Sequence, residues 1–556
     1  MKYSAKTLSQ TVVQLCLEKG IHHIVISPGS RNAPLTIGFT QHPKHHCFSV
    51  VDERCAAFVA LGMAQQLQLP VVLVCTSGSA LLNYFPAVAE AFYSSIPLVV
   101  LSADRPAHLI DIGDGQTIQQ EKVYGKHVLY SANCKEGTEF EANNITEINK
   151  ALNLAISKKG PVHINLPFSE PLYDLVDEPK VHPKNIIPKE NEFVLSESTL
   201  ADFISEWNTA PKKMILIGVL APGSIEEQWI NELGQLSDTI VLTETTSNLH
   251  HPDFFPRIDQ LITAFSEEEK QHFQPTLLLT FGGMIVSKRI KALLRKYPPQ
   301  QHWHVDPFQA RDTFFSLKHH IKCTPNTFLQ QFLPQIEQNH TSSYKSGWLS
   351  VKEYRLQKQK EFEANVPFTD FWTYNEVFQN IPKHRMLQLA NSTAIRYAQL
   401  FPIDPSLEVF CNRGTSGIDG STSTAVGAAI VSEKPVVFVT GDLSFFYDSN
   451  ALWNQYIPKH FRIILVNNGG GGIFRILPKA QEMEHFEKYF ETQHHLTAAA
   501  LCKMYNWGYH QAETKQQLKD IWSPFYESSS RPQLLEIFTP ASKNDEVLKA
   551  YFSFIA

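Results

Sequence analysis

The chain has 556 residues, and 43% of them are hydrophobic, which is typical of a folded globular protein and excludes wholesale disorder. Its formal charge is −6, from 49 basic and 55 acidic residues, and no block of like charge stands out. We therefore expect neither nucleic acid nor an anionic membrane surface as a partner.

Targeting and metal signals are also missing from the sequence. Its apolar runs are far shorter than the roughly 18 residues of a membrane-spanning helix, and residues 1–7 lack the apolar core of a signal peptide. The eight cysteines are scattered, so we interpret them as reduced. Adjacent histidines such as His22 and His23 have no zinc-like spacing with cysteine. These features predict a cytoplasmic protein without membrane insertion.

The N-terminal third alternates helix and strand patterns. A helical pattern begins near Thr7 and ends at Gly20. Apolar runs typical of buried parallel strands then follow at residues 24–26, 47–51, 71–75 and 98–101. Each run ends in polar residues, at positions 27–31, 52–54, 76–79 and 102–106. This alternation predicts a doubly wound parallel sheet with polar residues along one edge.

Two further series of the same kind follow a proline-rich stretch, residues 174–200, that we interpret as a linker. The second series has predicted strands at 214–219, 239–243, 277–280 and 302–305. The third has them at 386–390, 409–411, 436–440, 463–466 and 534–538. We therefore predict three α/β domains, each a doubly wound parallel sheet, over residues 1–180, 181–345 and 346–556.

Two strands of the third series end in motifs suited to a cation and a phosphate. Gly441-Asp442-Leu443-Ser444 follows one strand, and Asn467-Asn468-Gly469-Gly470 follows the next. The carboxyl ends of parallel strands form the edge where such sheets bind ligands. Oxygens of Asp and Asn suit Mg²⁺, and glycines let the backbone approach a diphosphate. We predict Asp442, Asn468 and the Gly470 carbonyl as metal ligands, with a purely structural turn at Asp442 as the alternative.

These motifs resemble the signature of thiamine-diphosphate enzymes, and the three-domain plan resembles the pyruvate decarboxylase and acetohydroxyacid synthase-like superfamily. Other stretches are similar to the 2-succinyl-5-enolpyruvyl-6-hydroxy-3-cyclohexene-1-carboxylate synthase family of menaquinone biosynthesis. They are residues 27–35 (SPGSRNAPL), Asp104-Arg105-Pro106, Gly115-Gln116-Thr117-Ile118 and residues 412–420 (NRGTSGIDG). The middle domain matches mainly through Ser287-Lys288-Arg289.

The resemblance implies thiamine diphosphate and Mg²⁺ or Mn²⁺ as cofactors. It implies that Glu53, which follows the second predicted strand, hydrogen-bonds the pyrimidine ring and that Ile418 supports the bent cofactor. The remaining implied cofactor contacts are Ser392, Gly441, Asp442, Leu443, Ser444, Asn468 and Ile473. From the local sequence alone, Glu53 could instead cap a helix, and Ile418 could be an ordinary core residue.

Six cations lie in or near the strand-end motifs. Each alone could be solvated or ion-paired, but together they suit dicarboxylate substrates, because Arg binds a carboxylate bidentately. The resemblance implies that Arg396 and Arg413 hold 2-oxoglutarate. It implies that isochorismate is held by Ser30, Arg31, Arg105, Gln116, Lys288 and Arg289. Glu53, Arg31, Arg396 and Arg413 are the implied catalytic residues.

The implied reaction is a decarboxylation of 2-oxoglutarate followed by a Stetter-like 1,4-addition of the succinyl unit to isochorismate, which is a transferase reaction. In the superfamily the glutamate reaches a cofactor whose diphosphate lies on the neighbouring subunit. A homodimer or homotetramer with active sites at the subunit interface is therefore implied.

Two other functions are compatible with parts of the sequence. Another thiamine-diphosphate decarboxylase or carboligase, such as an acetohydroxyacid synthase, is the main alternative, but such enzymes use monocarboxylates and need fewer arginines. A non-catalytic protein of the same fold is the second, but it would not need both Glu53 and Asp442. The chain departs from the family at Gly115, where asparagine is common, and at Gly472, where glutamine is common and where we expect a more mobile loop.

Overall fold

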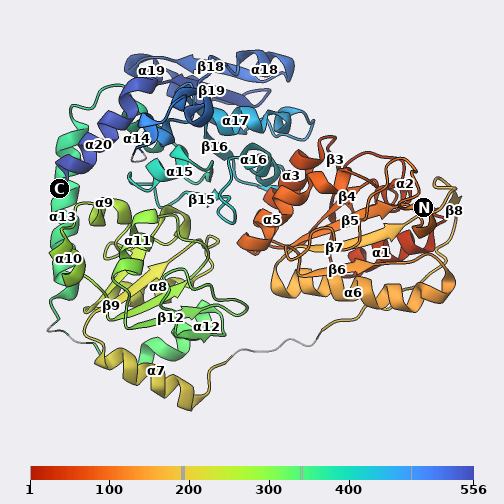
Figure 1. Ribbon diagram of the computed structural model, residues 1–556, viewed down its shortest axis with the longest axis horizontal. Helices are drawn as coiled ribbons and strands as arrows, with labels where there is room; N and C mark the ends of the chain where they lie inside the picture. Colours follow the sequence, from red (N-terminus) through yellow and green to blue (C-terminus); the bar gives the residue numbers. More distant parts are fainter. Residues whose placement is uncertain (1, 189–193, 339, 341, 477–478) are drawn as a thin grey trace.

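Three parallel sheets organise the protein, as the sequence predicts. The computed structural model describes residues 2–188, 194–338, 340, 342–476 and 479–556. Its N-terminal sheet has six strands, its middle sheet five and its C-terminal sheet six. Figure 1 shows them as three bodies, with the N-terminal body at the right, the middle body at the lower left and the C-terminal body above it. The predicted α/β fold is confirmed, whereas the domain boundaries at 180 and 345 stay a prediction.

The first and third sheets have the same topology. Their orders are β3-β2-β4-β5-β7-β6 and β15-β14-β16-β17-β19-β18, so the strands of both follow the sequence 2-1-3-4-6-5. The N-terminal strands are β2 (His23–Ile26), β3 (His46–Ser49), β4 (Val71–Cys75), β5 (Leu98–Asp104), β6 (Tyr130–Asn133) and β7 (Val162–Pro167). The C-terminal strands are β14 (Met386–Leu389), β15 (Glu408–Cys411), β16 (Val436–Gly441), β17 (Arg462–Asn467), β18 (Gly508–Ala512) and β19 (Gln533–Phe538).

The middle sheet has the order β10-β9-β11-β12-β13. Its strands are β9 (Lys213–Ile217), β10 (Thr239–Thr243), β11 (Leu277–Phe281), β12 (Gln301–Val305) and β13 (His319–Ile321). A small antiparallel ribbon, β1 (Tyr3–Ser4) with β8 (Leu175–Val176), ties the start of the chain to residues that the sequence assigned to a linker. Sequence patterns of two residues are too short to predict such a ribbon.

Helices cover both faces of each large sheet. Those of the N-terminal domain are α1 (Thr7–Glu18), α2 (Ala33–Thr40), α3 (Glu53–Leu67), α4 (Ala80–Asn83), α5 (Phe85–Ser94) and α6 (Glu141–Lys158). The middle domain has α7 (Glu197–Thr209), α8 (Glu227–Gln235), α9 (Ile258–Ile262), α10 (Glu267–His272), α11 (Lys288–Lys296) and α12 (Pro325–Phe332). The C-terminal domain has α14 (Asp370–Gln379), α15 (Thr393–Ala398), α16 (Ser421–Val431), α17 (Asp442–Tyr447), α18 (Ala499–Met504), α19 (Lys515–Tyr526) and α20 (Asn544–Phe554).

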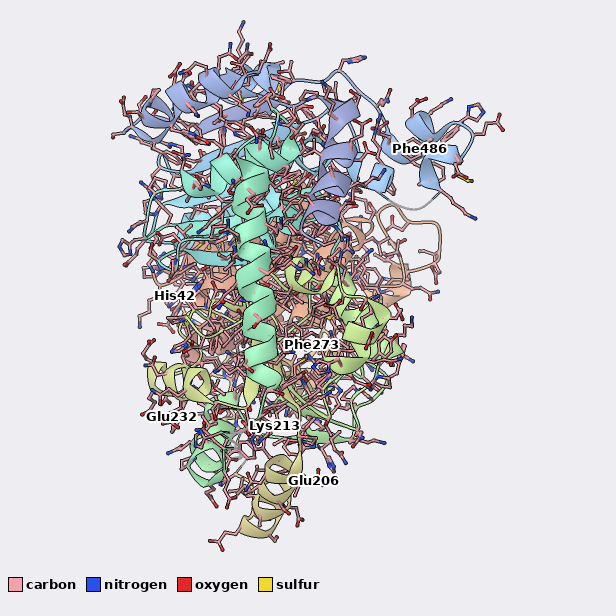
Figure 2. All side chains as sticks on the ribbon, turned by 90° about the vertical axis from the view of Figure 1, so that its left-hand side faces the viewer. His42, Glu206, Lys213, Glu232, Phe273 and Phe486 are labelled. Atoms are coloured by element: carbon pink, nitrogen blue, oxygen red, sulfur yellow. The ribbon has the colours of Figure 1, made fainter. Side chains whose placement is uncertain are left out.

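Helix α13 (Tyr344–Glu363) joins the middle and C-terminal domains. Figure 2 shows it as a long helix that runs between them, with Phe273 near its lower end. Phe273 packs against Trp348 of α13 in a tilted arrangement, at 5.1 Å between ring centroids, and Trp348 is fully buried. Arg355 of the same helix donates to the Ala556 carbonyl at 2.7 Å, so α13 contacts both the middle and the C-terminal domain.

The N- and C-terminal domains share one hydrophobic core through α3 and α16. The two helices touch backbone to backbone where each carries a glycine. A Cβ on Gly62 would lie 2.0 Å from the Thr424 carbonyl oxygen, and a Cβ on Gly427 would lie 2.0 Å from the Val59 carbonyl oxygen. No other residue fits at either position without separating the helices.

The described residues also bear on the cysteines, on membrane-spanning helices and on clusters of metal-binding side chains. All eight cysteines are free, and seven of them are buried. Among the residues that the structure describes, no helix is both long and apolar enough to cross a bilayer. In the same residues, no three His, Cys, Asp or Glu side chains gather in a way that could hold a metal ion. The predicted metal site needs only one of these residue types, because its other ligands are an amide and a carbonyl.

The helix contact yields a stability prediction. We expect Gly427→Ala to destabilise the protein by about 1–3 kcal/mol, because the new methyl group forces two backbones apart and this outweighs the gain in helix propensity. The measurement is the midpoint of thermal unfolding. The control is Gly115→Ala, because a Cβ on Gly115 has no neighbour within 4 Å. An unchanged midpoint in Gly427→Ala would show that the helices are not in backbone contact.

Candidate active site

The edge of the C-terminal sheet brings the two predicted cation motifs together. Asp442 begins α17 directly after β16, and Asn468 and Gly470 follow the neighbouring strand β17. The buried Asp442 carboxylate accepts hydrogen bonds from Leu443 N at 2.7 Å and from Gly470 N at 2.9 Å. A carboxylate accepts up to about four bonds, so lone pairs remain for a cation. The structural turn that was the alternative for Asp442 is present, but its hydrogen bonds use only some of the carboxylate's lone pairs.

The backbone at this edge is shaped by glycine. Gly470 has a φ of +154°, and a Cβ there would lie 2.8 Å from the Glu491 carbonyl oxygen. His494 also lies at the edge, with its Nε2 3.3 Å from Asp442 Oδ2. Its Nδ1 accepts a hydrogen bond from Leu496 N at 3.1 Å, which favours the tautomer with the proton on Nε2.

Asn468 is held by a carboxylate that the sequence analysis did not single out. Its Nδ2 donates to Asp370 Oδ2 at 2.9 Å, and Thr539 donates to the other oxygen of Asp370. Asp370 is the first residue of α14 and is 2% exposed. Burial raises the pKa of the Asp370 carboxyl to about 6.

Glu53 does not cap its helix. The N-cap of α3 is Asp52, whose side chain accepts from Cys55 N at 3.2 Å. The Glu53 carboxylate, half-buried, accepts a hydrogen bond from Asn83 Nδ2 at 3.2 Å. On its other side, Asp52 accepts from Asn450 Nδ2 at 2.8 Å, so that the C-terminal domain of the same chain holds the start of α3.

The remaining predicted cofactor contacts follow strands at the same end of the C-terminal sheet as Asp442 or lie next to it in the chain. Ile418 is 36% exposed, so the alternative that it is an ordinary core residue is wrong. Ser444 donates its hydroxyl proton to the Ile418 carbonyl oxygen at 2.7 Å, which leaves its backbone N–H as the donor for a phosphate. Ser392 has a φ of +67°, a conformation that is rare outside glycine and that occurs often at ligand sites. Leu443 and Ile473 are half-buried.

Arg396 and Arg413 lie close together between the C-terminal and middle domains. Burial lowers the pKa of Arg396, and the charge of Arg413 lowers it further. Arg413 donates through Nη1 to Asn391 Oδ1 at 2.7 Å. Asn391 in turn donates to the carbonyls of Asn412 at 2.6 Å and Gly417 at 2.7 Å, so it fixes the loop that carries Arg413.

A buried glutamate of the N-terminal domain holds the same loop. Glu90 of α5 accepts from Gly414 N at 2.7 Å, from Thr415 N at 2.6 Å and from Thr415 Oγ1 at 2.7 Å. It is 1% exposed, and a fourth bond comes from Ser94 Oγ at 2.8 Å. These bonds place the Arg413 loop relative to the N-terminal domain.

Two acids of the middle domain hold the start of α11, where Lys288 and Arg289 lie. Glu244 accepts from Val286 N at 2.6 Å and from Ser287 N at 2.7 Å, and Ser287 Oγ donates to Asp259. Burial raises the pKa of Glu244 to about 7. Lys288 and Arg289 are exposed, and the guanidinium of Arg289 lies 4.4 Å from the centre of the Phe552 ring.

The other predicted substrate residues lie at the N-terminal sheet. Arg31 is buried; its Nη1 donates to the Phe168 carbonyl at 2.7 Å, and its Nη2 lies 3.0 Å from Glu170. Arg105 donates to the Gly115 carbonyl at 3.2 Å. Ser30 and Gln116 are exposed near these cations.

The four arginines share one property. In the part of the chain that the structure describes, the Nε atoms of Arg31, Arg105, Arg396 and Arg413 are buried and have no hydrogen-bond partner. A buried guanidinium N–H without an acceptor is costly, and an anionic ligand would offset this cost. The Nε atoms of Arg54 and Arg355, which are not predicted site residues, have the same property, so it supports a ligand site only together with the predicted motifs.

The predicted residues form separate groups within one chain. Among the described residues, no hydrogen bond or ion pair joins Glu53 to Asp442, or Arg31 and Arg105 to Arg396 and Arg413. A cavity of about 360 Å³ lies where the three domains meet, but Arg413 is the only predicted site residue that lines it. The described residues therefore show these groups without a direct polar contact between them.

Comparisons with known proteins decide the family. The "Thiamine pyrophosphate enzyme, N-terminal TPP binding domain" matches residues 6–126, the "Middle domain of thiamine pyrophosphate" matches residues 190–387, and the "Thiamine pyrophosphate enzyme, C-terminal TPP binding domain" matches residues 392–537. Proteins named 2-succinyl-5-enolpyruvyl-6-hydroxy-3-cyclohexene-1-carboxylate synthase from Flavobacterium johnsoniae and Flavobacterium psychrophilum are 54% and 55% identical, each over 99% of both chains. The synthase of Bacteroides thetaiotaomicron is 37% identical, also over 99% of both. The chain belongs to this synthase family of thiamine pyrophosphate enzymes.

The residues present fit the cofactor of this family. Asp442 has free lone pairs, the Gly470 backbone reaches the edge of the sheet, and Ile418 exposes an apolar side chain. The departure at Gly472 also has a physical reason, since a Cβ there would lie 3.2 Å from Asn468 Nδ2. The departure at Gly115 leaves open space, because no atom lies within 4 Å of where a Cβ would stand.

Glu90 gives the first prediction for this site. Glu90→Gln leaves one side-chain oxygen for four donors and turns an NH₂ group toward backbone N–H groups. We expect residues 412–418 to exchange their amide hydrogens faster, and stability to fall by about 1–3 kcal/mol. The measurement is hydrogen exchange followed by mass spectrometry. Ser94→Ala is the matched control, because it removes only the Ser94 bond; equal exchange in both variants would contradict the role of Glu90.

Glu244 gives a pH prediction. The pKa of about 7 for the buried Glu244 carboxyl is above its ordinary value of 4.5. The folded protein therefore binds the extra proton, and the contribution of Glu244 to stability falls as pH rises from about 4.5 to about 7. Glu244→Gln does not titrate, so the difference between its thermal midpoint and that of the unmodified protein should change in favour of the variant as pH rises across this range. A constant difference between the two midpoints would show that folding does not raise the pKa of Glu244.

Proposed function

We propose that this protein decarboxylates 2-oxoglutarate and adds the succinyl unit to isochorismate, giving 2-succinyl-5-enolpyruvyl-6-hydroxy-3-cyclohexene-1-carboxylate in menaquinone biosynthesis. The observation that carries this proposal is the set of four arginines whose buried Nε–H groups lack an acceptor. Four guanidinium groups, each with an Nε–H that lacks an acceptor, match dicarboxylate substrates better than pyruvate, which has one carboxylate.

The metal and cofactor sites follow from the geometry at the C-terminal sheet. Asp442, Asn468 Oδ1 and the Gly470 carbonyl would hold Mg²⁺ or Mn²⁺, which prefer oxygen ligands. The backbone N–H of Ser444, together with Ser392, Gly441, Leu443 and Ile473, would contact the diphosphate. When bound, thiamine diphosphate supplies a nucleophilic carbon and an electron sink for decarboxylation.

The protein's own residues supply orientation and proton control. Glu53 would hold a proton at its carboxylate beside the pyrimidine ring, and Ile418 would keep the ring in its bent form. Arg396 and Arg413 would bind the carboxylates of 2-oxoglutarate. Ser30, Arg31, Arg105, Gln116, Lys288 and Arg289 would bind isochorismate, so that the two reacting carbons lie close together and water is excluded.

A second copy of the chain would complete the site, in a homodimer or homotetramer. Large apolar side chains are exposed around Glu53 and its neighbours: Val51 is 49% exposed, Leu82 is 42% exposed, and Tyr447, which packs on Arg54, is 54% exposed. Such a surface suits burial by another subunit. We further propose that the enzyme acts in the cytoplasm, because all eight cysteines are free.

Product analysis tests the proposed reaction. We expect the enzyme with thiamine diphosphate and Mg²⁺ to form the named product from 2-oxoglutarate and isochorismate, and to form no carboligation product from pyruvate. Glu53→Gln should lower turnover by at least about 100-fold, because it removes an acid–base group. Mass spectrometry of the products is the measurement, with Glu141→Gln, a substitution on the surface of α6, as the control. A product from pyruvate alone would instead favour an acetohydroxyacid synthase-like activity.

A further inference from the structure

A buried carboxylate lies directly behind one of the proposed metal ligands. Asp370 opens α14, Asn468 follows β17, and Thr539 follows β19, so three segments distant in sequence converge on one side chain. Asp370 Oδ2 accepts from Asn468 Nδ2 at 2.9 Å, and its other oxygen accepts from Thr539 Oγ1. Its backbone N–H donates to Asn544 Oδ1 at 2.9 Å, which ties the start of α20 to the same point.

This contact removes an ambiguity that an asparagine side chain always has. The amide group carries an oxygen on one branch and an NH₂ group on the other, and a half-turn about its last bond exchanges them. Only the oxygen can bind a cation. An ionised carboxylate accepts hydrogen bonds and donates none, so Asp370 draws the NH₂ group to itself. The Asn468 oxygen is then on the opposite branch, away from Asp370.

The glycine at position 472 fits the same arrangement. A Cβ there would lie 3.2 Å from Asn468 Nδ2, so a larger residue would press on the NH₂ group. Asp370 is itself fixed, because it is 2% exposed and its carboxylate is held on both oxygens. Partners of this kind orient metal ligands in many proteins, and their loss lowers metal affinity.

We propose that Asp370 is a positioning residue that selects the orientation of the Asn468 amide in which its oxygen faces the metal. This inference rests on the proposed function, because it takes Asn468 as a ligand of Mg²⁺. Asp370 does not touch the metal, and it acts only through Asn468.

The test measures metal-dependent cofactor binding without substrates. We expect Asp370→Ala to raise the Mg²⁺ concentration needed for half-maximal thiamine diphosphate binding by about 10–100-fold. Calorimetry or tryptophan fluorescence gives this value. Thr539→Val is the matched control, because it removes the other partner of Asp370 and leaves the bond to Asn468; it should shift the value by less than about threefold.

A second pair of variants covers the case in which Asp370→Ala does not fold. Asn468→Asp places two carboxylates in contact, and we expect it to weaken Mg²⁺-dependent cofactor binding. Adding Asp370→Asn lets the new amide donate to the new carboxylate, so the double variant should recover most of the lost affinity. Equal affinity of Asn468→Asp and the double variant would overturn the proposal.

The outcomes separate this inference from the proposed function. If the unmodified protein binds thiamine diphosphate without any dependence on Mg²⁺ or Mn²⁺, the proposed metal site is wrong and the inference is wrong with it. If binding depends on the metal but Asp370→Ala binds as well as the unmodified protein, only the inference is overturned.

Discussion

The contact between α3 and α16 is the constraint on which the arrangement of the site depends. Each helix follows the second strand of its sheet, and each carries a glycine at the point where the backbones touch. The ends of these helices lead to the residues of interest, since Glu53 begins α3 and Ile418 lies three residues before α16. A rigid crossing of the two helices therefore fixes the positions of Glu53 and Ile418 relative to each other. Because the two domains repeat the same topology, this crossing is nearly symmetric.

Buried carboxylates form a second layer of organisation around this contact. Glu90, Glu244 and Asp370 each lie behind a predicted ligand and hold it by accepting hydrogen bonds from loops. A carboxylate suits this role, because in its ionised form it accepts several hydrogen bonds and donates none. The result is a set of cations and oxygens whose positions are fixed before any ligand binds.

Much of the fold could be predicted from apolar runs, because central parallel strands are buried on both faces. The strands that were not predicted have polar residues or lie at an edge. β7 alternates apolar residues with His163 and Asn165, which are buried because they bond to Ser102, and β6, β13 and β18 lie at sheet edges. The supporting acids could not be predicted, since Glu90 reaches a loop 324 residues away and nothing in its local sequence shows this. The role of Asp370 could not be predicted from the sequence either, although its position at the start of a helix could be.

The central claim is that Glu53 of one subunit and Asp442 of another serve the same active site. Neither Glu53→Gln nor Asp442→Ala alone should be active, but a mixed dimer of the two contains one site in which both acids are intact. Unfolding and refolding the two variants together should therefore restore about a quarter of the unmodified activity, as random pairing of subunits requires. No recovery in correctly assembled mixed dimers would contradict the shared site and place both acids at a site within one chain.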